Sequence, residues 1–224
     1  MVSMAAIPLH RDIHYPESDG EPMAETEIHL DVTIDLIQGL RRRYRDAPDV
    51  YVVGDMFLYY AQGDPRSVVS PDVFLVRGVP KTPRRRTYKL WEEGKAPSLV
   101  IEVTSDSTRD EDVRKKKEIY EGLGIEEYFL FDPLGDYLKP RLQGYRLEGG
   151  RYQRIPADRD GALRSRVTGL ILRPEEAGLR LVDAGTGESI PWEGELDDRV
   201  REAEKRANAA EAELARLRRE LDRR

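Results

Sequence analysis

Apolar residues recur every three or four positions from Thr26 to about Tyr44, and this spacing predicts an amphipathic helix. His29 falls inside the apolar stripe. It either packs as a satisfied histidine between helix and sheet, or contacts a substrate or a metal-bound water at the helix start. Residues 1–25 contain three prolines and show no periodicity, so we expect an irregular N-terminal arm. The stripe comprises Val32, Leu36, Leu40 and Tyr44, and is widened by Leu30, Ile34 and Ile37.

Short runs of apolar and β-branched residues, separated by turn residues, predict strands after this helix. The first two runs flank Gly54-Asp55, and this pattern is typical of a β-hairpin. A long polar connection over residues 78–97 follows the third run, and Tyr88–Trp91 favours a short helical turn within it. The predicted strands are Val50–Val53, Met56–Tyr60, Asp72–Val76 and Leu99–Thr104.

The next part of the chain reads as a helix and then a strand. Ser105-Asp106-Ser107-Thr108 offers capping residues for a helix that begins near Asp110, and Gly122 and Gly124 end it. A strand over Glu126–Phe131 then implies a right-handed crossover and parallel pairing with the strand before the helix. Later short strands add to the same sheet or form a small flap; they are Leu142–Leu147, Gly150–Ile155, Leu170–Leu172 and Leu179–Val182. We therefore predict an α/β or α+β fold with a mixed central sheet flanked by helices.

A heptad pattern begins at about Glu195 and continues to the end of the chain without a change of register. It predicts a C-terminal coiled-coil helix over residues 193–224, after a main domain over residues 26–192. The helix pairs with another copy of the chain or folds back on its own domain, and the unbroken register favours pairing. Alanine at central positions buries little area, so the coil is thin or antiparallel. The seam comprises Leu196, Val200, Ala203, Ala207, Ala210, Leu214, Leu217 and Leu221.

The amino-acid composition excludes some kinds of site and bears on where the protein is located. The chain of 224 residues contains no cysteine, which excludes disulfides and thiolate metal sites. No apolar run reaches membrane-spanning length and no signal pattern is visible, so we expect a soluble, cytoplasmic protein. The net charge of −6 is not typical of a nucleic-acid binder. Basic residues nevertheless cluster in three runs, 41–45, 84–89 and 114–117, which are solvated faces or phosphate contacts.

Glu102 interrupts an otherwise apolar strand. A carboxylate in such a place must be paired, hydrogen-bonded or bound to a metal. Alternate residues of a strand share a face, so Glu102 lies with Val100 and Thr104. If the strand that begins at Asp72 is its neighbour, both carboxylates converge on one hard cation, Mg²⁺ or Mn²⁺, with the backbone carbonyl of Val103 as a further ligand. Such a metal could polarise a phosphoryl oxygen and activate water.

Lys116 points toward the apolar side of the helix that follows Glu102. On a helical wheel Lys115 points away and Lys117 lies at the rim, whereas Lys116 falls near the middle of the face formed by Val113, Ile119, Tyr120 and Leu123. The side chain either snorkels to solvent or meets a buried acid. With Glu102 on the preceding strand, we favour the acid. Lys116 could then orient a water or stabilise charge on a phosphate.

The motifs at these positions resemble the PD-(D/E)xK nuclease superfamily, whose core is a mixed sheet flanked by helices. Pro71-Asp72 and Glu102-Val103-Thr104 carry the resemblance. Thr104 stands where the superfamily usually has lysine. A lysine moved to the following helix is a known variation, and Lys116 is suitably placed for it.

More specifically, residues 25–192 are similar to the Uma-two family, a group of restriction-endonuclease-like proteins also described as a domain of unknown function. His29 matches a histidine that members often carry in the first helix, and many members add a C-terminal coiled coil. The ordered set of motifs is Val69-Ser70-Pro71-Asp72-Val73-Phe74, Val100-Ile101-Glu102-Val103-Thr104-Ser105, Lys116 four residues before Tyr120, and Leu123-Gly124-Ile125-Glu126-Glu127-Tyr128-Phe129-Leu130-Phe131-Asp132-Pro133.

Three functions are compatible with these residues: a metal-dependent DNA endonuclease, a nucleic-acid-binding relative with weak or no cleavage, and a coiled-coil assembly module with a structural ion network. The first is our leading hypothesis. The missing strand lysine and the acidic net charge favour the second. Under the first, the catalytic residues are Asp72, Glu102 and Lys116, the metal ligands are Asp72, Glu102 and Val103, and the residues assigned to substrate are His29, Thr104 and Ser105.

Overall fold

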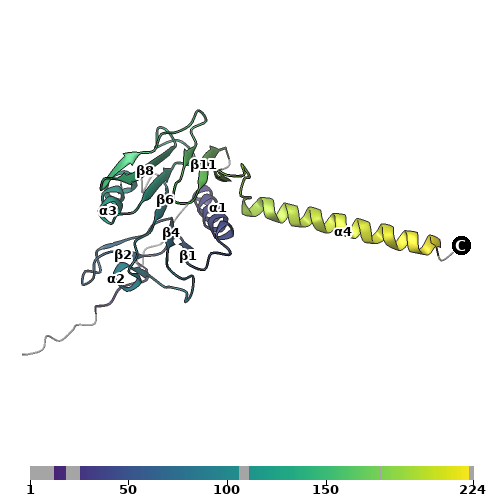
Figure 1. Ribbon diagram of the computed structural model, residues 1–224, viewed down its shortest axis with the longest axis horizontal. Coiled ribbons are helices and arrows are strands. Elements are labelled where there is room, and N and C mark those ends of the chain that lie inside the picture. Colours follow the sequence, from purple (N-terminus) through teal and green to yellow (C-terminus); the bar gives the residue numbers. More distant parts are fainter. Residues whose placement is uncertain (1–12, 19–25, 106–110, 177, 222–224) are drawn as a thin grey trace, which may run out of the picture.

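The computed structural model describes residues 13–18, 26–105, 111–176 and 178–221 (Figure 1). Its centre is a six-stranded mixed sheet with the strand order β1-β4-β6-β7-β8-β9. Within this sheet β6 and β7 pair in parallel, as the crossover between them predicts, and the other neighbours are antiparallel. The six strands are β1 (Val50–Val53), β4 (Val73–Arg77), β6 (Leu99–Val103), β7 (Glu127–Phe131), β8 (Leu142–Glu148) and β9 (Arg151–Arg154).

Two three-stranded sheets accompany the central one. The first contains β2 (Leu58–Tyr59), β3 (Val68–Val69) and β5 (Tyr88–Lys89). The second contains β10 (Leu163–Arg164), β11 (Leu170–Glu175) and β12 (Gly178–Asp183). The late strands are predicted to add to the central sheet or to form a small flap: β8 and β9 add to it, whereas β10, β11 and β12 form a sheet of their own.

Helices lie on both faces of the central sheet (Figure 1). The helix α1 (Glu27–Arg43) begins at Thr26, whose hydroxyl accepts a hydrogen bond from the backbone N–H of His29 at 3.2 Å. On the other face, a π-helical turn η1 (Glu111–Lys116) continues into α3 (Lys117–Gly122). A short helix α2 (Leu90–Glu93) follows β5. The prediction of a mixed sheet flanked by helices is confirmed.

Two apolar layers, one on each face of the sheet, form the core. Alternating residues of β6 divide between them: Leu99, Ile101 and Val103 join the layer under α1, and Val100 joins the layer that contains Tyr120 of α3. The β10–β12 sheet packs on the α1 side, where its leucines share the layer with α1. Glu102 alternates with its neighbours and therefore belongs to the α3 side, where it is fully buried.

The predicted hairpin between β1 and β2 is wrong. Instead β1 pairs with β4, and β2 pairs with β3 and β5 in a different sheet. At Asp55 the chain turns with φ 49° and donates a backbone hydrogen bond to the carbonyl of Pro71 at 3.0 Å. Local turn residues favoured a hairpin, but β1 is buried on both faces, and long-range pairing with β4 provides that burial.

The predicted apolar stripe of the first helix is too wide. Leu30 and Ile34 are 49% and 47% exposed, whereas Val32, Leu36 and Leu40 are buried. At 3.6 residues per turn, positions two apart lie on nearly opposite sides of a helix, so both lines cannot face one sheet. The predicted capping residues 106–108 lie outside the described residues.

The helix α4 (Glu193–Leu221) extends away from the rest of the molecule (Figure 1). Its first turn is held by ion pairs, Arg42 with Glu193 and Arg180 with Glu195. Farther along, Val200 and Leu214 are exposed. None of the helices in the described part of the chain is long and apolar enough to cross a membrane.

Candidate functional site

The two acids singled out by the sequence lie side by side where β4 begins and β6 ends. The antiparallel register pairs Val73 with Ile101, so the next pair outward is Asp72 and Glu102. The backbone N–H of Asp72 donates to Glu102 Oε2 at 3.1 Å. In return, the backbone N–H of Val103 donates to Asp72 Oδ2 at 2.7 Å. A backbone N–H of the neighbouring strand thus orients each carboxylate: that of Asp72 holds Glu102, and that of Val103 holds Asp72. The sheet therefore fixes the position of the pair.

The carboxylate of Glu102 is surrounded by donors. Its side chain is 0% exposed, so the ionised form needs close partners to offset the loss of water. Tyr120 donates its hydroxyl to Oε1 at 2.6 Å, and the Lys116 ammonium lies 3.1 Å from Oε2. The prediction that Lys116 meets a buried acid rather than snorkels is confirmed.

Both partners come from the helical segment packed on this face. Lys116 ends η1 and Tyr120 lies one turn later in α3, so the two side chains share one side of the helix. Lys116 also donates to the carbonyl of Ser70 at 3.4 Å, which joins the segment before β4 to the site. The helical wheel predicts Tyr120 only as a residue of the apolar face, without the contact of its hydroxyl with Glu102. The four-residue spacing after Lys116 was the available signal.

Asp72 is more accessible than Glu102, with 22% of its side chain exposed. Burial raises the pKa of its carboxyl, but a hydrogen bond from His29, the charge of Lys116 and the Val103 N–H together hold the pKa below its ordinary value. The site therefore presents an ionised carboxylate at neutral pH. Oδ2 accepts the Val103 N–H and lies 3.5 Å from His29 Nε2.

The three residues predicted to contact substrate differ in their burial and in their hydrogen bonding. His29 is buried against Asp72, reaching the end of the sheet from the α1 side, while Lys116 arrives from the other side. Thr104 is also buried, and its hydroxyl has no hydrogen-bond partner within the described residues. Ser105 is half-buried at the end of the described segment. A buried hydroxyl without a partner, two residues after Glu102 on the same chain segment, is a polar atom suited to a ligand.

The donor chemistry fits a hard divalent cation. Asp72 and Glu102 supply carboxylate oxygens, and Mg²⁺ is typically held by one or two carboxylates with several waters. Among the described residues there is no cluster of three or more His, Cys, Asp or Glu side chains that could form an all-protein cage. The residues therefore suit an open metal site in which water and substrate complete the coordination, and the Val103 carbonyl remains a predicted ligand.

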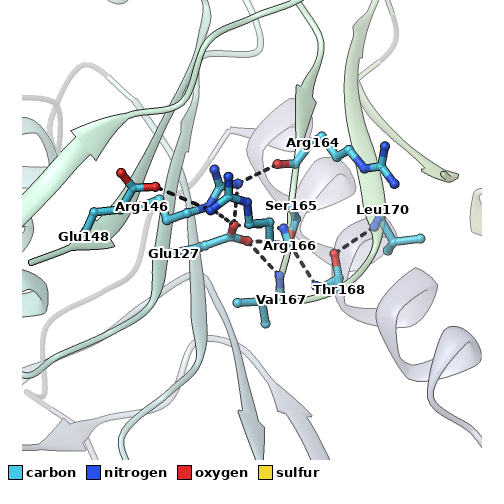
Figure 2. A network of polar contacts seen from close by, with 9 residues as sticks. All are labelled: Glu127, Arg146, Glu148, Arg164, Ser165, Arg166, Val167, Thr168 and Leu170. Atoms are coloured by element: carbon cyan, nitrogen blue, oxygen red, sulfur yellow. Dashed lines mark hydrogen bonds and ion pairs between the residues drawn. The ribbon is translucent and has the colours of Figure 1, made fainter.

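A second buried acid, Glu127 in β7, has a different environment (Figure 2). The guanidinium of Arg146 donates to its Oε1 at 2.9 Å. The loop after β10 supplies three more donors, namely the Ser165 hydroxyl and the backbone N–H groups of Arg166 and Val167. Glu127 thus fastens the β10–β11 loop to the central sheet. Among the described residues, the hydrogen-bond partners of Glu127 are all donors, and none of them is a second acid.

Fold and site together define a class: a mixed α/β fold with a pair of acids at the ends of adjacent strands and a lysine on the following helix. The chain belongs to the Uma2 family, which is described as "Putative restriction endonuclease" and whose model matches residues 3–173. No curated protein sequence matches the chain.

A solved structure shows the same fold. The crystal structure of "a putative nuclease belonging to DUF820" from Anabaena variabilis superposes with a TM-score of 0.51 at 15% sequence identity. The match covers 72% of this chain and 87% of that chain. At this identity the similarity concerns the fold, and the resemblance to the Uma-two family inferred from the motifs is confirmed by the family match.

Proposed function

We propose that this protein is a metal-dependent DNA endonuclease that hydrolyses phosphodiester bonds. The observation that carries the proposal is the mutual orientation of Asp72 and Glu102 at the ends of β4 and β6, with the Lys116 ammonium 3.1 Å from Glu102. Membership in a restriction endonuclease family supports it. DNA is the proposed substrate and Mg²⁺ or Mn²⁺ the proposed cofactor.

Each residue has a distinct part in this proposal. Asp72, Glu102 and the Val103 carbonyl would hold the cation, which when bound supplies Lewis acidity toward a phosphoryl oxygen. Tyr120 fixes the plane of the Glu102 carboxylate through its bond to Oε1. Lys116 stabilises negative charge on the phosphate or orients the attacking water.

The remaining polar residues orient the acids and the substrate. His29 restrains Asp72 from the α1 side. Thr104 and Ser105 would contact the phosphate of the substrate, and the buried Thr104 hydroxyl has no hydrogen-bond partner among the described residues. Because Thr104 replaces the usual strand lysine, positive charge enters this site from the helix, through Lys116.

Glu102→Gln tests the proposal. The amide keeps the size of the side chain but weakens metal binding, so we expect DNA cleavage with Mg²⁺ or Mn²⁺ to fall by about 10³-fold. The fold should persist, because Asp72 remains as a counter-charge for Lys116. Glu127→Gln is the control, since it neutralises a buried glutamate outside the site; because it is expected to lower stability, cleavage is compared well below its melting temperature. Equal cleavage by wild type and Glu102→Gln would show that Glu102 has no catalytic role.

A structural ion network is the competing function, and one observation favours it. Both oxygens of Glu102 already have protein partners, namely Tyr120, Lys116 and the Asp72 N–H. A purely structural network predicts that Glu102→Gln lowers stability by about 3–5 kcal/mol and that Mg²⁺ leaves the melting temperature unchanged. Our proposal predicts that Mg²⁺ raises the melting temperature of wild type but not of Glu102→Gln. A nucleic-acid-binding relative without activity would bind DNA and show no cleavage with either metal.

We further propose that α4 pairs with another copy of the chain and makes the protein a homo-oligomer. Val200 and Leu214 lie exposed on the predicted seam, and most of α4 has no contact with the rest of the described chain. Deleting residues from 195 onward should therefore lower the mass measured by light scattering to that of the monomer. An unchanged mass would contradict pairing through α4.

A further inference from the structure

Two of the three basic runs of the sequence meet in one cavity. The cavity has a volume of about 530 Å³ and lies beside β1, the edge strand of the central sheet. Arg41 and Arg45 come from the end of α1, and Lys81, Arg84 and Arg85 come from the connection after β4. No acidic residue lines the cavity within the described part of the chain. In a protein with a net charge of −6, this wall is a local concentration of positive charge.

Two of these five cationic side chains are already held by partners in the protein. Arg85 forms a bidentate pair with Glu93, at 2.6 and 2.9 Å, and its guanidinium lies over the ring of Tyr51. Lys81 donates to the carbonyls of Tyr44 and Arg45 at 2.5 and 2.8 Å. These carbonyls end α1, and a helix C-terminus repels anions. Lys81 therefore removes a feature that would disfavour an anion in the cavity.

The other three cations keep charge available for a ligand. Arg41 uses only Nε, which donates to the carbonyl of Val52 at 3.1 Å. The side chains of Arg45 and Arg84 are exposed and form no hydrogen bond or ion pair with any described residue. A guanidinium group offers donors in a planar fork that matches phosphate oxygens. Three such groups around one cavity define a site for phosphate rather than for a single carboxylate.

The cavity also has a fixed relation to the two acids. Its wall follows β1 from Val50 to Val53, and Val53 pairs with Phe74 of β4. The next residue, Gly54, lies so close to Asp72 that an added Cβ would be 2.0 Å from the Asp72 carbonyl oxygen. A four-residue strand is about 13 Å long. That length corresponds to the rise of about four base pairs along the axis of a DNA duplex.

We propose that this cavity binds backbone phosphates of the DNA segment that flanks the scissile bond. The inference rests on the proposed function for the identity of the polymer, because the same DNA must reach Asp72. The contacts are to phosphate and not to bases, so they hold the DNA in position without selecting a sequence. Arg45 and Arg84 contribute most, since their guanidinium groups have no partner among the described residues.

The test compares two double variants of the full chain with equal loss of charge. Arg45→Ala with Arg84→Ala removes the two available cations. Arg154→Ala with Arg159→Ala is the control, because both residues are exposed and Arg154 lies on β9, the opposite edge of the sheet. Binding to a fluorescein-labelled 20-base-pair duplex is measured by anisotropy over a range of salt concentrations, in EDTA so that no metal is present.

We expect the Arg45/Arg84 variant to bind more weakly and its salt dependence to fall. Each phosphate contact contributes about 0.9 to the slope of log K against log salt concentration, so the slope should decrease by about 2. The control should keep the wild-type affinity and slope. Equal weakening in both variants, or no change in the Arg45/Arg84 variant, would overturn the inference. The inference would also be overturned if the protein bound inorganic phosphate at millimolar concentration but did not bind the duplex.

This outcome is separable from that of the nuclease proposal. If wild type binds DNA through Arg45 and Arg84 but does not cleave with Mg²⁺ or Mn²⁺, the phosphate site stands and the nuclease proposal fails. If wild type cleaves while the Arg45/Arg84 variant binds like wild type, the nuclease proposal stands and the phosphate site fails. A thermal melt of each variant checks that the fold is unchanged.

Discussion

Two buried glutamates, Glu102 and Glu127, lie on the two parallel strands at the centre of the sheet, at opposite ends. The register pairs Glu127 with Leu99 at the start of β6, whereas Glu102 pairs with Leu130 near its end. Both are almost completely inaccessible to solvent and both lie close to a basic side chain. Burial and an ion pair are therefore common to both and do not distinguish a functional acid from a structural one.

The surroundings make the distinction. Glu127 receives donors from a loop that it fastens to the sheet. Glu102 lies beside a second acid, Asp72, and two residues before Thr104, whose buried hydroxyl has no partner in the described chain. Two acids close together suit a cation, and an unsatisfied polar atom suits a ligand. A functional acid is therefore distinguished from a structural one by a second carboxylate and an unsatisfied polar atom in its surroundings, and not by burial or an ion pair.

The largest stability effect should come from Glu127→Gln. The change removes the counter-charge of Arg146 and one of the two oxygens that accept hydrogen bonds from the Ser165 loop, so we expect a loss of about 3–5 kcal/mol. For a chain of this size the melting temperature should fall by about 10 °C. Cleavage at temperatures well below the melt should stay near wild type. A variant that melts like wild type would show that the Glu127 network contributes little to the fold.

Gly54→Ala should displace Asp72, the acid beside Glu102. The new Cβ would lie 2.0 Å from the Asp72 carbonyl oxygen and 2.6 Å from a methyl group of Ile37, so the backbone must move. Misplacement of about 1 Å at a reacting group costs about 10²-fold in rate. We therefore expect cleavage to fall by that factor, measured as kcat on plasmid DNA. Gly122→Ala is the control, since a Cβ there meets no atom within 4 Å.

The smallest effect should be a dependence of stability on pH through Asp72. Its folded pKa is lowered, so its contribution is present above the unfolded pKa near 3.9 and is lost as the pH falls through the folded value. The difference in unfolding free energy between wild type and Asp72→Asn should shrink as the pH is lowered from about 5 to 3. Urea denaturation without metal at several pH values measures it. A difference that is constant with pH would indicate that the pKa of Asp72 is not lowered.

The sequence determined the elements whose pattern is local. The helix over Glu27–Arg43 and the strands over Leu99–Val103 and Glu127–Phe131 follow from periodicity and caps, and the parallel pair follows from the strand–helix–strand order. A helical wheel also predicts that Lys116, rather than its basic neighbours, faces the buried side of its helix. Local preferences and burial agree in these segments, so one chain segment carries enough information.

Only the tertiary structure decided which strands pair and which charges meet. The turn at Gly54-Asp55 favours a hairpin locally, but β1 gains more burial against β4. Tyr120 is an ordinary core residue on a helical wheel until the fold places its hydroxyl 2.6 Å from Glu102. Arg45 and Arg84 lie 39 positions apart in the printed sequence and line one cavity. These outcomes depend on contacts between distant segments, whose energies no local pattern contains.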